Sequence, residues 1–387
     1  MNRTTSRRAL LGGMIALALA ACGSSSTTAT TSASTAGTGT TAASGAATTK
    51  AAGAATTAAA AATTAAPAAD LKATLNGSGS TFSKAYQDEA ALAFTAKNKG
   101  VTINYGGGGS GKGRTDLASQ LVDFAGSDSP FKDADLANNK GGDVLYFPVL
   151  VGPITLSYNV DGVDKLQLSA DTIAKIFQRQ IKTWDDAAIA ADNPGAKLPS
   201  TAITVAHRSD GSGTTQNFTE YLVKAAPTAW TLKSGSTVEW PADTQAGNGN
   251  AGVAQIVTGT KGAIGYVDLS DAVAAKLKFA TIKNKAGKYV APTSDGASAA
   301  AAGVTVADNL IFSSTNPDGD AAYPITAQTF IIVYAKQTDK AKADALKAYL
   351  TYLMTDGQKL LTDLNYAPLP KSIQDKALAQ LSKITVG

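Results

Sequence analysis

Three turns rich in glycine and hydroxyl residues are the parts of this sequence best suited to chemistry. They occupy residues 76–82, 106–113 and 208–215. Each is predicted to follow a strand and to precede a helix, an order that presents free backbone N–H groups at the positive helix end. Such turns attract oxyanions, and Arg208 adds a formal positive charge to the third turn. We therefore expect these turns to form an anion site.

The same turns do not match two common kinds of enzyme. Residues 106–112 satisfy the G-x-x-x-x-G-K pattern of an NTPase loop, but Gly113 replaces the Ser or Thr that would hold magnesium. The serines of these turns do not fit the G-x-S-x-G nucleophile elbow. The one histidine, His207, lies beside Arg208, and we interpret it as a structural residue rather than a general base. We expect no catalysis.

Composition limits the other classes of protein. The chain has 387 residues, of which 44% are hydrophobic and 17% charged, which suits two globular domains. One cysteine and one histidine are too few for a disulfide framework or for a zinc site of the nitrogen and sulfur type. A formal net charge of +4 is too weak a balance to indicate nucleic acid. We expect no cofactor, no metal and no nucleic-acid partner.

The first residues resemble an export signal that ends at a lipid attachment site. Three arginines precede an apolar run at residues 9–21, which is short for a membrane span and typical of a signal peptide. Residues 19–22, Leu-Ala-Ala-Cys, resemble a bacterial lipobox. We expect removal of residues 1–21 and a lipid on Cys22 that anchors the chain to the outer face of the cell membrane. The paired arginines also resemble a twin-arginine signal, so general and twin-arginine export both remain open.

Residues 22–69 form the predicted connection between that lipid and the folded part. After Cys22 this segment is almost only Ala, Thr, Ser and Gly, with Lys50 as its sole charge. Without large apolar side chains it cannot offset the entropy lost on ordering, so we predict a disordered tether. A low-complexity helix is the alternative, which the interspersed Thr, Ser and Gly weaken. The threonines are also candidates for glycosylation.

The remainder, residues 70–387, shows alternating helical and strand patterns. The predicted helices are residues 83–97, 114–121, 169–177, 218–224, 251–258 and 340–354. The predicted strands are residues 101–105, 144–150, 154–158, 203–206, 263–267 and 330–334. The alternation predicts an α/β fold with a parallel or mixed sheet covered by helices. This length exceeds what one core usually supports, so we expect two lobes.

Five motifs resemble, in their order along the chain, those of a known family. They are GSGSTF at 77–82, DFAGSD at 123–128, IKTWDD at 181–186, RSDGSGT at 208–214 and GAIGYV at 262–267. Together they resemble the phosphate-binding protein of the Pst-type phosphate ABC transporter, a likeness that spans residues 71–369. It implies a two-lobed, hinged periplasmic-binding-protein fold of type II, with each lobe a mixed sheet flanked by helices. Lobe 1 would comprise residues 70–150 plus 322–387, and lobe 2 residues 151–321.

The resemblance also implies a set of phosphate ligands. These are Thr81, Phe82, Ser110, Asp128, Arg208, Ser212, Gly213 and Thr214. Phe82 and Gly213 would contribute backbone N–H groups, and Asp210 would orient Arg208 from behind. The family further implies a monomeric solute-binding lipoprotein that delivers inorganic phosphate to the permease subunits of an ABC importer.

Asp128 is the residue expected to select among anions. Phosphate near neutrality keeps at least one O–H, which an ionised carboxylate can accept, whereas sulfate has no such proton. Asp128 would then reject sulfate, because two buried acceptors would face each other. The alternative interpretation is that Asp128, before Ser129-Pro130, only caps a turn. A binding protein for another tetrahedral oxyanion such as sulfate, or an envelope hydrolase of phosphate esters, remains the alternative function.

Overall fold

The computed structural model describes residues 70–136 and 138–387 of the chain. The predictions for the signal peptide, for Cys22 and for the tether lie outside these residues. Within the described part of the chain, no helix has the length and the apolar character needed to cross a membrane.

Helices and strands alternate along the described chain, as the sequence pattern predicted. The helices are α1 (Lys84–Lys97), α2 (Ser110–Ala118), α3 (Asp133–Leu136), α4 (Ala170–Phe177), α5 (Ala187–Asp192), α6 (Gly213–Ala225), α7 (Gly249–Gly259), α8 (Leu269–Ala274), α9 (Ser294–Ala302), α10 (Lys340–Met354) and α11 (Lys371–Gln380). The strands are β1 (Ala73–Gly79), β2 (Val101–Gly108), β3 (Phe124–Ser127), β4 (Val144–Asn159), β5 (Gln167–Leu168), β6 (Thr204–Arg208), β7 (Gln245–Gly247), β8 (Ala263–Asp268), β9 (Lys278–Phe279), β10 (Thr281–Lys283), β11 (Tyr289–Val290), β12 (Thr326–Tyr334), β13 (Lys336–Gln337) and β14 (Thr385–Val386).

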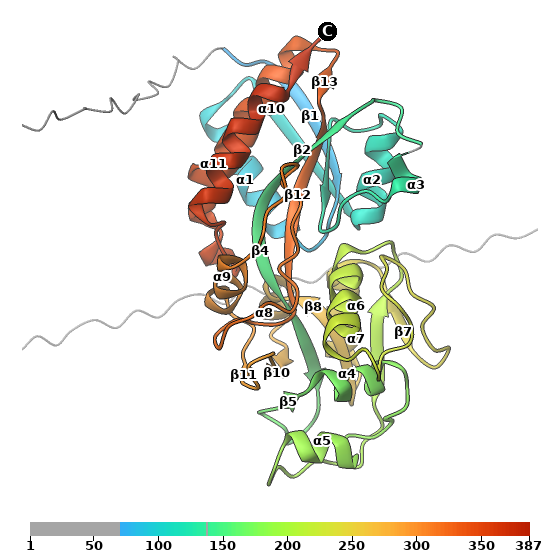
Figure 1. Ribbon diagram of the computed structural model, residues 1–387. Helices are drawn as coiled ribbons and strands as arrows, with labels where there is room; N and C mark the ends of the chain where they lie inside the picture. Colours follow the sequence, from blue (N-terminus) through green and yellow to red (C-terminus); the bar gives the residue numbers. More distant parts are fainter. Residues whose placement is uncertain (1–69, 137) are drawn as a thin grey trace, which may run out of the picture. The chain divides into compact units, whose positions relative to one another are not determined.

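Most strands belong to one mixed sheet in which β4 has two successive partners. The strand order is β2-β1-β3-β12-β4-β8-β6-β7. Residues 144–153 of β4 pair antiparallel with β12, and residues 154–159 pair antiparallel with β8. By contrast, β1 runs parallel to β2 and β3, and β6 runs parallel to β7 and β8. Figure 1 shows β4 extending from one group of strands to the other.

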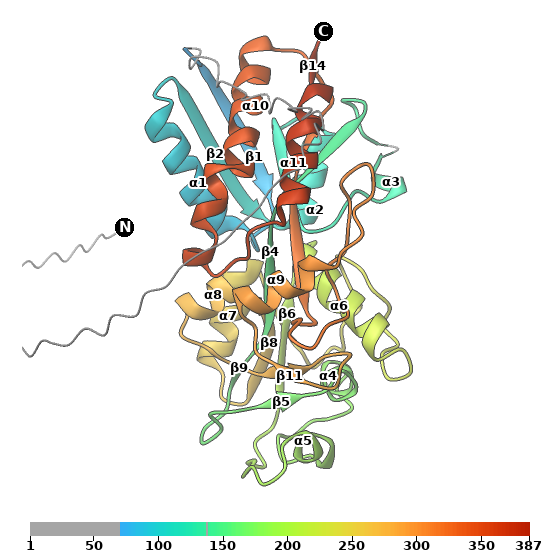
Figure 2. The same cartoon turned by 60° about the vertical axis from the view of Figure 1, so that its left-hand side comes forward.

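This change of partner divides the sheet into two halves. The first half consists of β2, β1, β3, β12 and residues 144–153, and it contacts α1, α2 and α10. The second half consists of residues 154–159, β8, β6 and β7, and it contacts α6 and α7. Helices α8 and α9 lie beside β4 between the two groups, as Figure 2 shows. The described residues pack as one compact unit, so the predicted lobe boundaries at residues 150 and 321 stay a prediction.

The central strands of the first half are completely buried. Every residue of β3 and of β12 lies in the core, as do most residues of β4. Side chains from helices and neighbouring strands therefore cover both faces of these strands. Rigid buried strands can hold polar groups at their ends in a fixed position.

Three details of the predicted elements are wrong. Residues 144–150 and 154–158 form one continuous strand, because Pro153 lies where β4 changes partner and a missing N–H is tolerated there. Residues 76–79, predicted as part of a turn, belong to strand β1. Helices α2 and α6 begin at Ser110 and Gly213, several residues before their predicted starts, since local glycine content lowers helix propensity but does not override packing.

Candidate functional site

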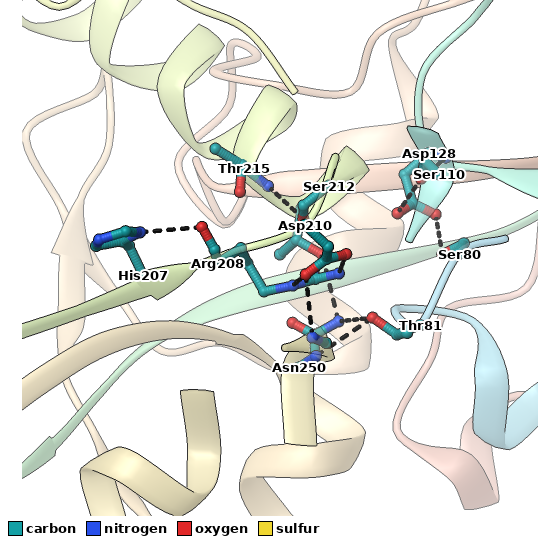
Figure 3. A network of polar contacts seen from close by, with 12 residues as sticks. Ser80, Thr81, Ser110, Asp128, His207, Arg208, Asp210, Ser212, Thr215 and Asn250 are labelled. Carbon is teal, nitrogen blue, oxygen red and sulfur yellow. Dashed lines mark hydrogen bonds and ion pairs between the residues drawn. The ribbon is translucent and has the colours of Figure 1, made fainter. Parts of the chain in front are cut away.

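The residues predicted to bind an anion come together where several strands end and helices begin. Thr81 follows β1, Asp128 follows β3, and Arg208 is the last residue of β6. Ser110 opens α2, and Ser212 is the N-cap of α6. The carboxyl ends of strands in an open α/β sheet are the usual place for ligands. Figure 3 shows Ser110, Asp128, Arg208, Ser212 and Thr81 gathered in one network of polar contacts.

The two halves of the sheet contribute turns that touch each other directly at this point. The Gly111 backbone N–H donates to the Gly211 carbonyl at 2.8 Å. A Cβ atom on Gly213 would lie 2.3 Å from Ser110 Oγ and 2.6 Å from Asp128 Oδ2. Only glycine at position 213 allows this approach without displacing the site residues. The second and third glycine-rich turns therefore form one site.

Asp128 is a carboxylate of the site with three hydroxyl donors, and 1% of its surface is exposed. Its Oδ1 accepts hydrogen bonds from Ser80 Oγ at 2.6 Å and from Thr329 Oγ1 at 2.7 Å. Its Oδ2 accepts from Ser110 Oγ at 3.2 Å. Burial raises the pKa of Asp128, while these hydroxyl donors and the Arg208 charge favour the ionised form and oppose that rise.

The peptide groups around Asp128 are held as firmly as its side chain. The Asp128 carbonyl accepts from Asn217 Nδ2 at 2.7 Å and from Gln328 Nε2 at 3.1 Å. Asn217 belongs to α6 of the second half, and Gln328 belongs to β12 of the first. Ser127 and Ser129, on either side of Asp128, each accept from Arg114 Nη1 at 2.9 Å. These contacts fix the direction of the carboxylate.

Arg208 is a second buried cation of the site, and Asp210 holds its position. Its Nε donates to Asp210 Oδ1 at 2.8 Å, and its Nη2 forms a short ion pair with Asp210 Oδ2. Its Nη1 donates to Thr214 Oγ1 at 3.3 Å. Burial acts to raise the pKa of Asp210, but the Arg208 guanidinium outweighs it and holds this pKa below its ordinary value. Asp210 thus lies where an orienting carboxylate is expected.

The remaining predicted residues occupy helix starts or the core. Ser212 Oγ accepts from the Thr215 backbone N–H at 3.0 Å and caps α6. Thr81 Oγ1 accepts from the backbone N–H and from Nδ2 of Asn250, both at 3.2 Å. Phe82 has a fully buried ring that packs on Tyr366, and its carbonyl accepts from the Tyr366 hydroxyl at 2.6 Å. Core packing of the Phe82 side chain leaves its backbone for the site.

His207 has the contacts of a structural residue. Its Nδ1 lies 2.9 Å from the Arg208 carbonyl oxygen, and its ring stacks on Trp240 at 5.0 Å between centroids. Burial lowers the pKa of His207, which favours the neutral ring. Figure 3 shows the ring apart from the hydroxyls and carboxylates of the site. These contacts agree with the interpretation made from the sequence.

Sequence reasoning missed several residues of this network. Ser80 lies inside the GSGSTF motif at 77–82, so its hydroxyl was a usable signal. Asn250 lies in a stretch of glycine and asparagine at residues 247–252, outside the five motifs, and its amide was a weaker signal. Thr329 lies in β12, a fully buried strand, and nothing in the sequence of that strand indicated that Thr329 would face the site. In the described residues, no group of three or more His, Cys, Asp or Glu side chains is placed to hold a metal ion.

Comparison with known proteins identifies the relatives of this chain. Residues 61–357 match the family model described as PBP superfamily domain. The phosphate-binding protein PstS of Xylella fastidiosa is 36% identical over 307 residues, which cover 77% of this chain and 82% of that protein. PstS of Methanocaldococcus jannaschii is 37% identical over 306 residues, covering 73% and 78% respectively.

Solved structures confirm the predicted fold. A high affinity periplasmic phosphate-binding protein, solved with phosphate, superposes with a TM-score of 0.68 at 23% identity, covering 80% of this chain and 94% of that one. A putative phosphate ABC transporter substrate-binding protein from Clostridium perfringens gives a TM-score of 0.58 at 16% identity, covering 77% and 100%. At these identities the likeness shows the fold alone. The fold is therefore the two-lobed periplasmic-binding architecture, type II.

Proposed function

The chain belongs to the PBP superfamily and, within it, to the phosphate-binding proteins named PstS, and on this basis we propose that it captures inorganic phosphate outside the cytoplasm for an ABC importer. Its action is binding and delivery rather than catalysis. The observation that carries this proposal is the meeting of Arg208, two helix starts and one buried carboxylate between the two halves of the sheet.

The site suits a small, highly charged anion because its attraction comes mainly from oriented dipoles. The turn before α1 and the starts of α2, α6 and α7 all contribute residues to the network, so the N-termini of these helices lie near one region. The charge of Arg208 is largely offset by its ion pair with Asp210. Fixed N–H and O–H groups can replace the hydration shell of an anion without reorganising.

We assign the predicted ligand set to this site on the basis of that geometry. The phosphate ligands are Thr81, Phe82, Ser110, Asp128, Arg208, Ser212, Gly213 and Thr214. Asp210 acts behind Arg208 and keeps its Nη1 edge directed toward Thr214. Ligands from both halves mean that binding and closure of the halves are one event.

Asp128 gives the site its preference for a protonated anion. When phosphate enters, we expect Ser110 to turn its hydroxyl from Asp128 Oδ2 toward the ligand, which frees that oxygen to accept the phosphate O–H. Sulfate carries no proton at neutral pH and would leave two buried acceptors facing each other. Selectivity for phosphate over sulfate therefore depends on the proton that sulfate lacks, rather than on the size of the anion.

Titration calorimetry tests this function. The purified chain carrying Cys22→Ser, stripped of bound phosphate, is expected to bind one phosphate per chain. Sulfate is expected to bind at least about 100-fold more weakly, since an unpaired buried charged acceptor costs several kcal/mol. Equal affinity for sulfate would favour a general oxyanion-binding protein. Release of phosphate from p-nitrophenyl phosphate by the same sample would favour the hydrolase.

The first residues of the sequence indicate where the protein is located in the cell. We propose that the chain is exported and held on the outer face of the membrane by a lipid on Cys22, with residues 22–69 as the tether. The folded part then acts as a monomer and docks on the membrane permease subunits of the importer. A near-neutral mature chain, with 31 basic and 30 acidic side chains, would not be held by electrostatics alone.

Lipidation can be tested by mass spectrometry of the protein made in an exporting bacterial host. The full chain is expected to partition into membranes and to carry a diacylglyceryl group on an N-terminal Cys22. The Cys22→Ser variant is the control, and it should appear in the aqueous fraction with phosphate binding unchanged. A wild-type chain that retains residues 1–21 or lacks the lipid would contradict the anchor while leaving the binding function in place.

A further inference from the structure

Asn250 lies between residues from the two halves of the phosphate site. It is the second residue of α7, and its side chain is fully buried. One amide nitrogen, Nδ2, lies 3.2 Å from Thr81 Oγ1 and 3.3 Å from Thr214 Oγ1. The Asn250 backbone N–H adds a second donor to Thr81 at 3.2 Å. Figure 3 shows Asn250 beside Thr81 and below Arg208.

These contacts determine which way the two threonine hydroxyls can act. A hydroxyl has one proton to donate and two lone pairs that accept. Thr81 Oγ1 receives two N–H groups from Asn250, and Thr214 Oγ1 receives one from Asn250 and one from Arg208 Nη1. With both lone pairs occupied, each hydroxyl has only its proton left for a further partner. Both threonines are thus set as hydrogen-bond donors.

The start of α7 is built to bring this amide into place. Gly249 has a φ of +67°, a conformation that glycine adopts without strain, and its backbone N–H donates to Asp210 Oδ1 at 3.0 Å. The helix start is therefore tied to the carboxylate that also orients Arg208. A Cβ atom on Gly249 would lie 3.4 Å from Thr81 Cγ2, so α7 approaches the first half closely here.

The oxygen of the amide lacks the partners that its nitrogen has. Asn250 Oδ1 is buried and has no hydrogen-bond partner among the described residues. An unsatisfied buried acceptor is unfavourable and is uncommon in folded proteins. The arrangement leaves that acceptor unpaired while directing both N–H bonds of the amide at the two threonine hydroxyls.

We propose that Asn250 is a positioning residue of the phosphate site, which keeps Thr81 and Thr214 as donors toward the unprotonated oxygens of the ligand. Asp128 remains the acceptor for the protonated oxygen, so the donor and acceptor roles are assigned to different oxygens of the anion. This inference rests on the proposed function. It adds a residue outside the predicted ligand set, one that acts through two of its members.

The test compares two substitutions at this position by titration calorimetry with inorganic phosphate. Asn250→Ala removes the amide donors, and we expect affinity to fall about tenfold, as for the loss of one or two neutral hydrogen bonds. Asn250→Asp keeps the size but offers only acceptors, which would draw both threonine protons away from the ligand and add a negative charge. We expect the phosphate affinity of this variant to fall about 30- to 50-fold, because both effects act together.

A matched control separates the role of the amide from the added charge. Asn248 is the N-cap of the same helix and is exposed, so Asn248→Asp places an equal charge at the same helix start. We expect its affinity to stay within about twofold of wild type, because exposed charges are screened by solvent. Circular dichroism and thermal unfolding without phosphate check that all variants fold.

A double-mutant cycle isolates the orienting role. In a Thr81→Val and Thr214→Val background no hydroxyl is left to orient, so Asn250→Ala should cost no further affinity. An equal tenfold loss in that background, or wild-type affinity for Asn250→Asp, would overturn the inference. In both cases phosphate binding by the wild-type chain would still stand. Failure of the wild-type chain to bind phosphate would instead overturn the proposed function and this inference together.

Discussion

Replacing Arg208 with glutamine is expected to weaken phosphate binding by about a thousandfold, the largest effect of any single substitution in the site. Arg208 is a buried guanidinium of the site, with its side chain 1% exposed, and its Nη1 donates to Thr214 Oγ1. Glutamine removes the charge and leaves Asp210 buried without its ion partner, so a second negative charge then faces the anion. Calorimetry at constant ionic strength measures the loss.

Two further variants show whether the charge or its geometry matters. Arg208→Lys keeps the charge but loses the planar pair of donors to Asp210, and we expect an intermediate loss of about 30-fold. Arg208→Gln combined with Asp210→Asn removes both charges and controls for the unpaired carboxylate. Binding by Arg208→Gln within tenfold of wild type would show that the ligand does not lie beside this residue.

Asp128→Asn is expected to weaken phosphate binding by about 100-fold and to bring sulfate within about tenfold of phosphate. The amide can no longer accept as an anion, so the protonated oxygen of phosphate loses its best partner. At the same time the amide offers N–H donors, which removes the unfavourable contact with an unprotonated sulfate oxygen. Competition titrations with the two anions measure both changes in one experiment.

The pH dependence of binding provides a separate check on Asp128. Burial raises the pKa of this carboxyl group, so its protonation begins at a higher pH than for an exposed aspartate. As pH falls through this raised pKa, the acceptor is lost and phosphate affinity should decline. An asparagine side chain does not titrate in this range, so the Asp128→Asn variant should lack this decline. Unchanged selectivity between phosphate and sulfate in the variant would reject the proposed role of Asp128.

The residues that act within one short segment could be predicted from the sequence. Arg208, Asp210 and Thr214 lie within seven positions of one another, and their contacts follow from a strand, a turn and a helix start in succession. The alternation of helices and strands likewise fixes the fold class, because each element buries a face with its own period. Local pattern and family resemblance were therefore sufficient for this part of the site.

The surroundings of Asp128 could not be predicted in the same way. Thr329 bonds to Asp128 Oδ1 across 201 positions of the chain, and Asn217 bonds to its carbonyl across 89. Which polar residues of a buried strand or helix face the site depends on the sheet order and register. These come from packing over the whole domain rather than from local propensity. The sequence predicted two strands in place of β4 for a similar reason. The two partners of β4, β12 and β8, lie far from each other in sequence, so local patterns do not show that one strand pairs with both.

The unbroken course of β4 through both groups of strands limits how the site can empty. Strand β4 is continuous, and the chain returns to the first group of strands just before β12, beside residues 153–154. One group can therefore rotate against the other by bending at these two neighbouring crossings, near residues 152–154 and 325–326. Such bending moves one group of strands relative to the other along a single path. When the site closes again, the binding residues return to the same relative positions. Each cycle of release to the importer would then end with the receptor ready for the next ion, without a search for the correct arrangement.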